Sequence, residues 1–158
     1  MWSGQDTNRF STPLIFEGRI YLISGSQARC VNATNDEEIF QARIQAGEAA
    51  SGSDAPGGQP PREQGGDRGG FGGFGGGGFG GGGPGGSDYS SPVLGDGKIY
   101  YVTRKGEIHV IKPTDKFEQL ATNRVTSESE DFSATPAISS GQIFFRSNKH
   151  LYCVSLHK

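Results

Sequence analysis

Three residues able to bind a metal recur at one position of three similar stretches of the sequence. Cys30, His109 and Cys153 each lie twelve residues after a glycine that closes a predicted turn. Zinc accepts thiolate and imidazole ligands, but it needs all of them within about 2.3 Å of one ion. If the stretches form neighbouring sheets, equivalent positions are separated by about 10 Å. We therefore expect the three residues to fill equivalent packing positions, and we predict neither a metal site nor a disulfide.

The other reactive side chains form no recognisable catalytic motif. The Gly-rich stretch matches the spacing G-x-G-x-x-G, but it lacks the flanking strand and helix that dinucleotide binding requires. No phosphate-binding loop, nucleophile elbow or H-E-x-x-H pair occurs in the sequence. Two acidic clusters, at residues 36–38 and 128–131, are interpreted as solvated turns. We therefore predict no catalytic residue and no cofactor.

Charge and hydropathy exclude several functional classes. The 158 residues include 15 basic and 17 acidic side chains, so the chain lacks the basic excess of a nucleic-acid-binding protein. No apolar run approaches the roughly 18–20 residues that cross a bilayer. The first residues have neither the basic head nor the apolar stretch of a signal peptide. We predict no nucleic-acid partner and no transmembrane segment, and the sequence alone does not indicate a compartment.

Residues 45–88 form a low-complexity insert. They hold 20 of the 27 glycines and four of the eight prolines. Such a segment buries too little surface to offset the entropy lost on ordering, so we expect it to be disordered. Arg68-Gly69-Gly70 resembles one RGG element of RNA-binding tails. Since the insert carries two basic and five acidic residues, we interpret it as a flexible spacer instead.

The rest of the chain contains three copies of one strand pattern. In each copy a proline (Pro13, Pro92 or Pro136) precedes a glycine by five positions, and that glycine precedes an aromatic residue by three. Ile, Val, Tyr and Phe dominate the runs on either side, as is typical of strands. Each glycine allows the positive φ of a tight hairpin turn, at Glu17-Gly18, Asp96-Gly97 and Ser140-Gly141.

The copies predict strands in up-and-down order. A third run follows at residues 28–32, 107–111 and 150–154, and a fourth at 39–43 and 117–121 only. Four strands in about 40 residues is the pattern of a propeller blade. We predict an all-β fold without helices: a partial β-propeller of three consecutive four-stranded antiparallel blades, the last incomplete, with a disordered Gly-rich insert. The predicted divisions are an N-terminal segment with the first blade, the insert, the second blade and the incomplete third blade, at residues 1–44, 45–88, 89–125 and 126–158.

The opening pattern S-x-P-hydrophobic-x-x-x-G-x-I-Y resembles the pyrroloquinoline-quinone-like (PQQ-like) β-propeller repeat of bacterial proteins. The segment at residues 30–40, C-V-N-A-T-N-D-E-E-I-F, is similar to a changed form of the signature A-x-D-x-x-T-G-x-x-x-W. This resemblance implies a location in the periplasm or cell envelope. It also implies a non-enzymatic scaffold, or a module that binds a protein or glycan partner.

The alternative implied by the resemblance is a C-terminal fragment of a quinoprotein-type oxidoreductase, with its active residues in N-terminal blades that are missing here. Quinoproteins carry adjacent cysteines, calcium ligands and a catalytic aspartate. This sequence has no Cys-Cys pair and no match to that aspartate, so we favour the scaffold.

Three blades leave a propeller ring open, since closed rings have at least about four. We therefore expect further blades, or self-association, to close it. Turns between the second and third strands lie at the end of a propeller that usually carries its ligands, and the insert leaves the fold on that side. The basic residues near these turns are the candidate contacts for a charged ligand: Arg104, Lys105, Arg146 and Lys149.

Overall fold

The computed structural model describes residues 11–47 and 88–155, and all regular structure within them is β-strand. The first sheet has the strand order β1 (Leu14–Phe16), β2 (Arg19–Ser24), β3 (Gln27–Asn32), β4 (Glu38–Arg43). The second has the order β5 (Val93–Gly95), β6 (Lys98–Val102), β7 (Ile108–Ile111), β8 (Gln119–Asn123). The third contains β9 (Ala137–Ser139), β10 (Gln142–Arg146) and β11 (Leu151–Ser155).

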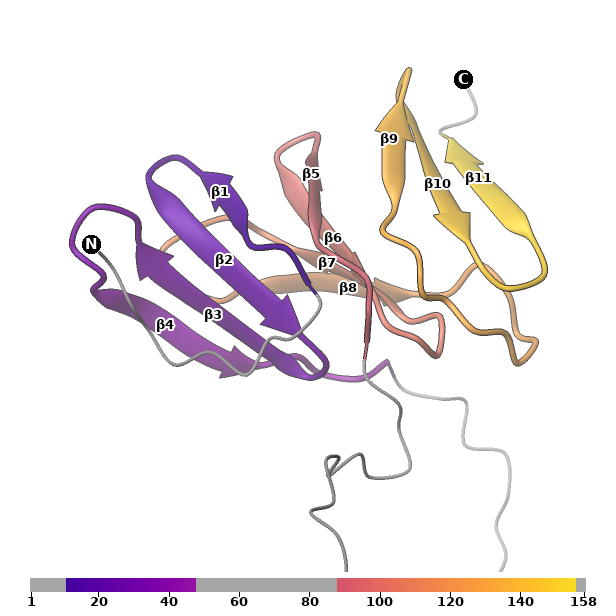
Figure 1. Ribbon diagram of the computed structural model, residues 1–158, viewed down its shortest axis with the longest axis horizontal. Coiled ribbons are helices and arrows are strands. Elements are labelled where there is room, and N and C mark those ends of the chain that lie inside the picture. The colour runs from indigo at the N-terminus through magenta and orange to yellow at the C-terminus, as the bar shows by residue number, and fades with distance from the viewer. Residues whose placement is uncertain (1–10, 48–87, 156–158) are drawn as a thin grey trace, which may run out of the picture.

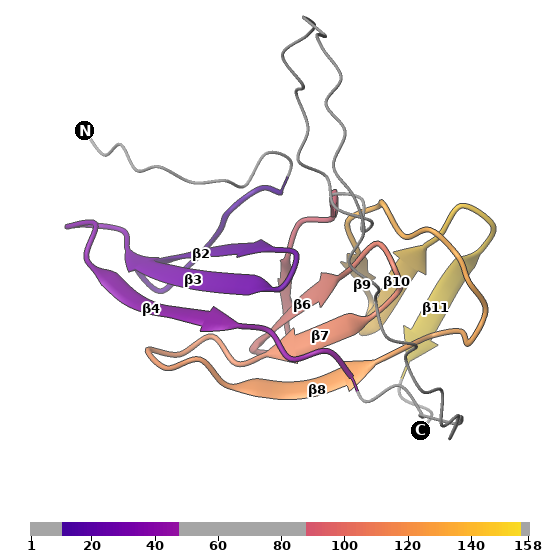
Figure 2. The same ribbon diagram turned by 90° about the horizontal axis from the view of Figure 1, so that it is seen from below.

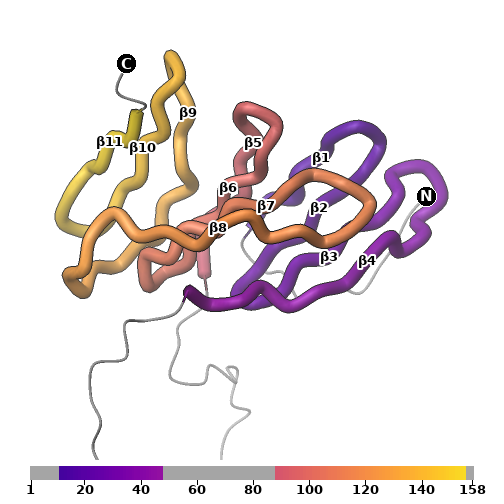
Figure 3. The backbone as a smooth tube through the Cα atoms, turned by 180° about the vertical axis from the view of Figure 1, so that it is seen from behind, coloured from indigo at the N-terminus to yellow at the C-terminus, as the bar shows by residue number. Residues whose placement is uncertain are grey.

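The three sheets follow one another in chain order, with the second between the first and the third (Figure 1, Figure 2). Every pair of neighbouring strands is antiparallel, and each proline of the repeat directly precedes the first strand of its sheet. The same succession is seen from behind in Figure 3. The predicted all-β fold of three propeller-like blades, the last one strand short, is therefore confirmed.

The first hairpin of each sheet turns where the sequence predicts it. Glu17-Gly18, Asp96-Gly97 and Ser140-Gly141 all have positive φ angles, between 47° and 74°. Two successive positive φ angles define a type I′ turn, whose twist matches that of the flanking strands. The turn glycines therefore establish the same hairpin three times.

Hydrogen bonds between sheets involve the residue that precedes each repeat proline. The Thr12 amide donates to Ser91 Oγ at 2.8 Å. The Ser91 amide in turn donates to Thr135 Oγ1 at 3.0 Å. Because the same repeat position is used twice, the second sheet sits on the first much as the third sits on the second.

Two apolar clusters fill the spaces between the sheets. Tyr21, Ile23 and Cys30 of the first sheet pack with Ile99 and Tyr101 of the second. A second cluster combines residues of the second and third sheets with the connection between them: Val102, Ile108, Phe132 and Phe145. Full burial of one such side chain contributes about 1.5–3 kcal/mol, so these contacts hold the row of sheets together.

The outer strand of the second sheet was predicted at residues 117–121 and lies instead at Gln119–Asn123. Phe117 belongs to the connection before it, where its ring lies 5.9 Å from that of Phe40 in the first sheet. An apolar residue partly buried between two sheets gives the same sequence signal as one within a strand, which explains the two-residue error. The third strands deviate by one residue at most from 28–32, 107–111 and 150–154.

Disorder was predicted for residues 45–88; positions 48–87 lie outside the described part of the chain, and only residues 45–47 and 88 of the insert are described. The observed sheets lie within the predicted divisions 1–44, 89–125 and 126–158. Among the described residues, no helix is long and apolar enough to cross a membrane.

Candidate functional site

A cavity of about 970 Å³ lies at the end of the sheets where the second and third strands turn. We call it the turn-side cavity. The β2–β3, β6–β7 and β10–β11 turns contribute Gly25, Arg104 and Asn148. Ala46 and Asp88, at the two ends of the predicted insert, also line it. The prediction that the insert leaves the fold on the same side as these turns is thus confirmed.

The four predicted basic residues are not all in this cavity. Arg104 and Lys105 line it. Arg146 is exposed at the end of β10, and Lys149 Nζ donates to the carbonyl oxygen of Ser129 at 3.5 Å. The structure therefore brings two of them together, and the proposed contact with a charged ligand stays a prediction.

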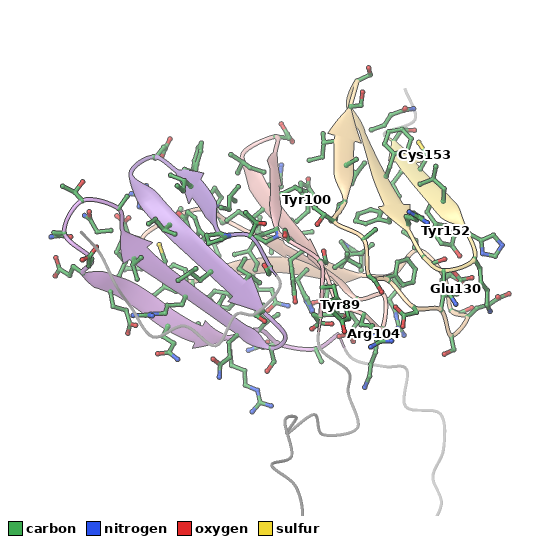
Figure 4. All side chains as sticks on the ribbon, in the orientation of Figure 1. Tyr89, Tyr100, Arg104, Glu130, Tyr152 and Cys153 are labelled. Carbon is green, nitrogen blue, oxygen red and sulfur yellow. The ribbon has the colours of Figure 1, made fainter. Side chains whose placement is uncertain are left out.

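Arg104 is tied to acidic neighbours. Its Nε donates to Asp131 Oδ2 at 2.5 Å, and its backbone amide donates to Asp88 Oδ1 at 2.6 Å. The guanidinium also lies 5.9 Å from the centre of the Tyr89 ring, on the same side of the molecule (Figure 4). The Ser133 hydroxyl, with Arg104 adding to its effect, lowers the pKa of Asp131. Arg104 thus joins the β6–β7 turn to the β8–β9 connection and to the segment before β5.

The charge of the turn-side cavity is negative. Its lining has three cationic side chains, Arg104, Lys105 and Arg124. Its five carboxylates come from Asp88, Glu107, Glu128, Glu130 and Asp131. The difference of two negative charges disfavours an anionic ligand, although the candidate residues found in the sequence are all basic.

Glu130 is the residue that the sequence interpretation missed. Its side chain is completely buried, so the prediction that residues 128–131 form only a solvated turn is wrong. Glu130 Oε1 lies 2.8 Å from His150 Nδ1, and Oε2 accepts a hydrogen bond from the Tyr152 hydroxyl at 2.9 Å. A hydrogen bond from Ser147 is the main cause that lowers the pKa of Glu130, and bonds from His150 and Tyr152 add to it.

These partners lie 17 to 22 positions from Glu130 along the chain, on β11 and the turn before it. Figure 4 shows Glu130 beside Tyr152. No local pattern in the sequence links the two segments, and only the folded third sheet brings them together. The carboxylate attaches the β8–β9 connection to the third sheet.

Cys30 and Cys153 occupy equivalent positions, but His109 does not, contrary to the prediction. Cys30 lies opposite Tyr21 and Cys153 opposite Phe144, whereas His109 lies opposite Tyr101. The β2–β3 and β10–β11 turns have two residues between the closing pair, but the β6–β7 turn has three, since the Thr103 amide donates to the Glu107 carbonyl. One extra residue reverses the face of every following side chain, and Val110 takes the position equivalent to Cys30.

The three residues also differ in burial. Cys30 and His109 are buried, and burial raises the pKa of the Cys30 thiol and lowers that of the His109 imidazole. Cys153 is exposed, so the expectation of a packing position is wrong there. Within residues 11–47 and 88–155 there is no group of three or more His, Cys, Asp and Glu residues suited to a metal ion.

Cys153 belongs to what we call the open face, formed by Phe144, Arg146, Leu151 and Cys153 on the third sheet. The corresponding residues of the first sheet are buried against the second sheet: Tyr21, Ile23, Ala28 and Cys30. On the open face, Leu151 is 67% exposed. The same face of the repeat is thus covered in the first sheet and exposed in the third.

No protein-family model matches the chain, and no curated protein matches its sequence. The arguments for its function therefore come from two features of the described residues. One is the turn-side cavity, where Arg104 binds Asp131 and Glu130 binds His150 and Tyr152. The other is the third sheet, which lacks an outer strand and carries the open face.

Proposed function

We propose that the chain is a non-enzymatic scaffold of the PQQ-like β-propeller type, and that it binds a protein partner through the open face of its third sheet. One observation carries this proposal. The face that is buried by the next sheet in the first repeat is exposed in the third, with Leu151 and Cys153 in contact with solvent. An exposed apolar side chain at a position that another sheet covers elsewhere in the chain is typical of an interaction site.

A protein fits this surface better than a glycan does. The open face offers apolar and thiol side chains around Phe144, and the backbone of β11 beside it has no partner strand on its outer side among the described strands. Both features are satisfied by another β-structure, through side-chain packing and main-chain hydrogen bonds.

The turn-side cavity supports a scaffold more than an enzyme. Arg104 binds Asp131, and Glu130 binds His150 and Tyr152. Groups paired in this way join structural segments to one another. We therefore retain the scaffold over the quinoprotein alternative, with the cell envelope as its proposed location on the basis of the repeat resemblance.

Light scattering during size-exclusion chromatography tests the open face. Without its partner, this surface is expected to drive association of the purified chain, so the mean mass should rise above 16.7 kDa as concentration increases. The substitution Leu151→Glu places a charge at the centre of the face and is expected to restore the monomer.

Leu120→Glu is the matched control, since Leu120 is an exposed leucine on the outer strand β8 of the second sheet. It should leave the association unchanged. A wild-type mass that stays monomeric at every concentration would overturn the proposal. An equal effect of both substitutions would do so as well, because it would show nonspecific adhesion.

A further inference from the structure

We propose that β11 pairs with a strand of the partner protein, antiparallel and in the register that β4 adopts on β3. This inference rests on the proposed function, because it names the element by which the partner is held. It specifies which backbone groups bind, and which side-chain pattern the partner strand carries.

The backbone groups follow from the alternation of antiparallel pairs. At the β10–β11 turn, the Ser147 amide donates to the His150 carbonyl at 2.9 Å, so Ser147 and His150 form a hydrogen-bonded pair. In the following pair, Arg146 and Leu151, the amide and carbonyl of Leu151 therefore point away from β10. The same holds for every second residue of β11 after Leu151. The residues concerned are Leu151, Cys153 and Ser155, and no described strand lies on that side of β11.

The two complete sheets show how such an edge is filled. The Asn32 amide donates to the Glu37 carbonyl at 2.9 Å, and the Lys112 amide donates to the Glu118 carbonyl at 3.0 Å. Both donors occupy the position that Ser155 has in the third sheet. In both sheets the register also shifts at the same place, between Cys30 and Val31 and between Val110 and Ile111. The outer strand therefore pairs with the third strand in the same way in the first and second sheets.

The side chains of the partner strand can be inferred from these two examples. Opposite the Cys153 position lie Phe40 in the first sheet and Ala121 in the second. The Phe40 ring lies 6.5 Å from that of Tyr21, whose place in the third sheet is taken by Phe144. We therefore expect an apolar residue opposite Cys153, in contact with Phe144.

The next positions are polar and then no larger than asparagine. Gln41 and Thr122 follow, with side chains on the opposite face. At the place of Leu151, Ala42 lies opposite Ala28 in the first sheet and Asn123 lies opposite Ile108 in the second. The pattern expected of the partner strand is thus an apolar residue, a polar residue, and then alanine or asparagine.

The sequence of β11 also differs from that of a strand meant to face solvent. Leu151–Ser155 reads L-Y-C-V-S and contains neither a charged residue nor a proline. The outer strand β4, by comparison, carries Glu38 and Arg43 at its ends. Charged residues and prolines normally protect exposed edges from further pairing, and β11 has no such protection.

A peptide of residues 36–44, which contains β4, is the probe for this edge. Labelled with a fluorophore, it should bind the full chain saturably, as followed by fluorescence anisotropy. The Ile44 amide donates to the Ser26 carbonyl at 2.8 Å, so by alternation the amides of Phe40 and Ala42 also face β3. N-methylation at Phe40 should weaken binding at least about tenfold, which equals about 1.4 kcal/mol.

N-methylation at Gln41 is the matched control, because the Gln41 amide points away from the paired strand. It should leave the affinity nearly unchanged. Hydrogen exchange measured with the unmodified peptide should show slower exchange at Leu151, Cys153 and Ser155. Equal losses for the two methylated peptides would overturn the proposed register.

The outcomes separate this inference from the proposed function. If Leu151→Glu abolishes association while the peptide neither binds nor protects the β11 amides, strand pairing is wrong and the open face still acts as the docking surface. If the same amides are protected in the concentrated protein alone, a second copy supplies the strand, which overturns the assignment to a partner. If neither association nor peptide binding occurs, both proposals fail.

Discussion

Two buried tyrosines show that the effect of a buried hydroxyl group on stability depends on its surroundings. Tyr101 is completely buried, and its hydroxyl accepts a hydrogen bond from the Gly25 amide at 2.9 Å, which joins the second sheet to a turn of the first. Tyr21 is equally buried, but among the described residues its hydroxyl has no nitrogen or oxygen partner, and only the Cys30 thiol, a weak hydrogen-bonding group, interacts with it. Burial raises the pKa of Tyr21 to about 12. The Tyr101 hydroxyl thus links two sheets, whereas the buried Tyr21 hydroxyl destabilises the fold.

Replacing each tyrosine with phenylalanine should therefore have different effects. Tyr101→Phe leaves the Gly25 amide without its acceptor, and we expect the free energy of unfolding to fall by about 1–2 kcal/mol. Tyr21→Phe removes an unsatisfied buried polar atom, so stability should stay the same or rise. Urea unfolding followed by circular dichroism measures both. An equal loss in the two variants would contradict this account of the hydroxyls.

The sequence could not distinguish these two roles. Tyr21 and Tyr100 are the aromatic residues that the repeat pattern singles out, whereas Tyr101 lies one position later, where the third sheet has Phe145. The partner of Tyr101 is 76 positions away along the chain. Apolar character and burial were predictable from the pattern, but the hydrogen bond depends on how two sheets stack.

At the scale of elements, the residues of a turn determine the conformation of some connections, but not of all. The three type I′ turns follow from glycines whose conformational freedom is a property of the residue itself. The β6–β7 turn is one residue longer than its counterparts, and this length reversed the face of His109. The spacing of twelve residues in the sequence gave no sign of the change, because strand register depends on the pairing partner. Residues 128–131 were likewise predicted to form a solvated turn, although Glu130 buries its carboxylate there.

The Glu130 carboxylate should make the stability of the third sheet dependent on pH. Its partners Ser147, His150 and Tyr152 lower its pKa in the folded state. The resulting stability is therefore complete above the ordinary glutamate pKa of 4.5, and it is lost as the pH falls from there through the lowered value. Glu130→Gln should remove much of this dependence, as measured by thermal unfolding between neutral and acidic pH.

Glu128→Gln is the control for this experiment, since Glu128 is exposed two positions earlier in the same connection. It should keep the wild-type loss of stability in acid. If Glu130→Gln keeps that loss as well, the buried carboxylate is not its cause.

At the scale of the whole molecule, the sheets differ in how they are covered. The second sheet lies between the other two, and all four residues of β7 are buried. The third sheet has one covered face and one open face. Because each sheet contacts only its neighbours in the row, local opening should be easiest at the uncovered end.

Hydrogen exchange of the native protein should reveal this order. We expect the slowest amides in β6 and β7 of the second sheet, and much faster exchange at the outward amides of Leu151 and Cys153. Ala28 and Cys30 provide the internal comparison, since they hold the equivalent positions in a sheet whose outer strand is present. Equal protection at Cys30 and Cys153 would contradict an open edge at β11.

The sequence by itself determined the strands, the hairpin turns and the three-fold repeat of the pattern, because side-chain preference and turn conformation act between residues that are close along the chain. The tertiary structure decided which faces meet, which strand edge has no neighbour among the described strands, and how Glu130 and Tyr101 find their partners. Those outcomes depend on the register between strands and on the stacking of whole sheets. A difference of one residue in a turn changes both, while the pattern of apolar residues stays the same.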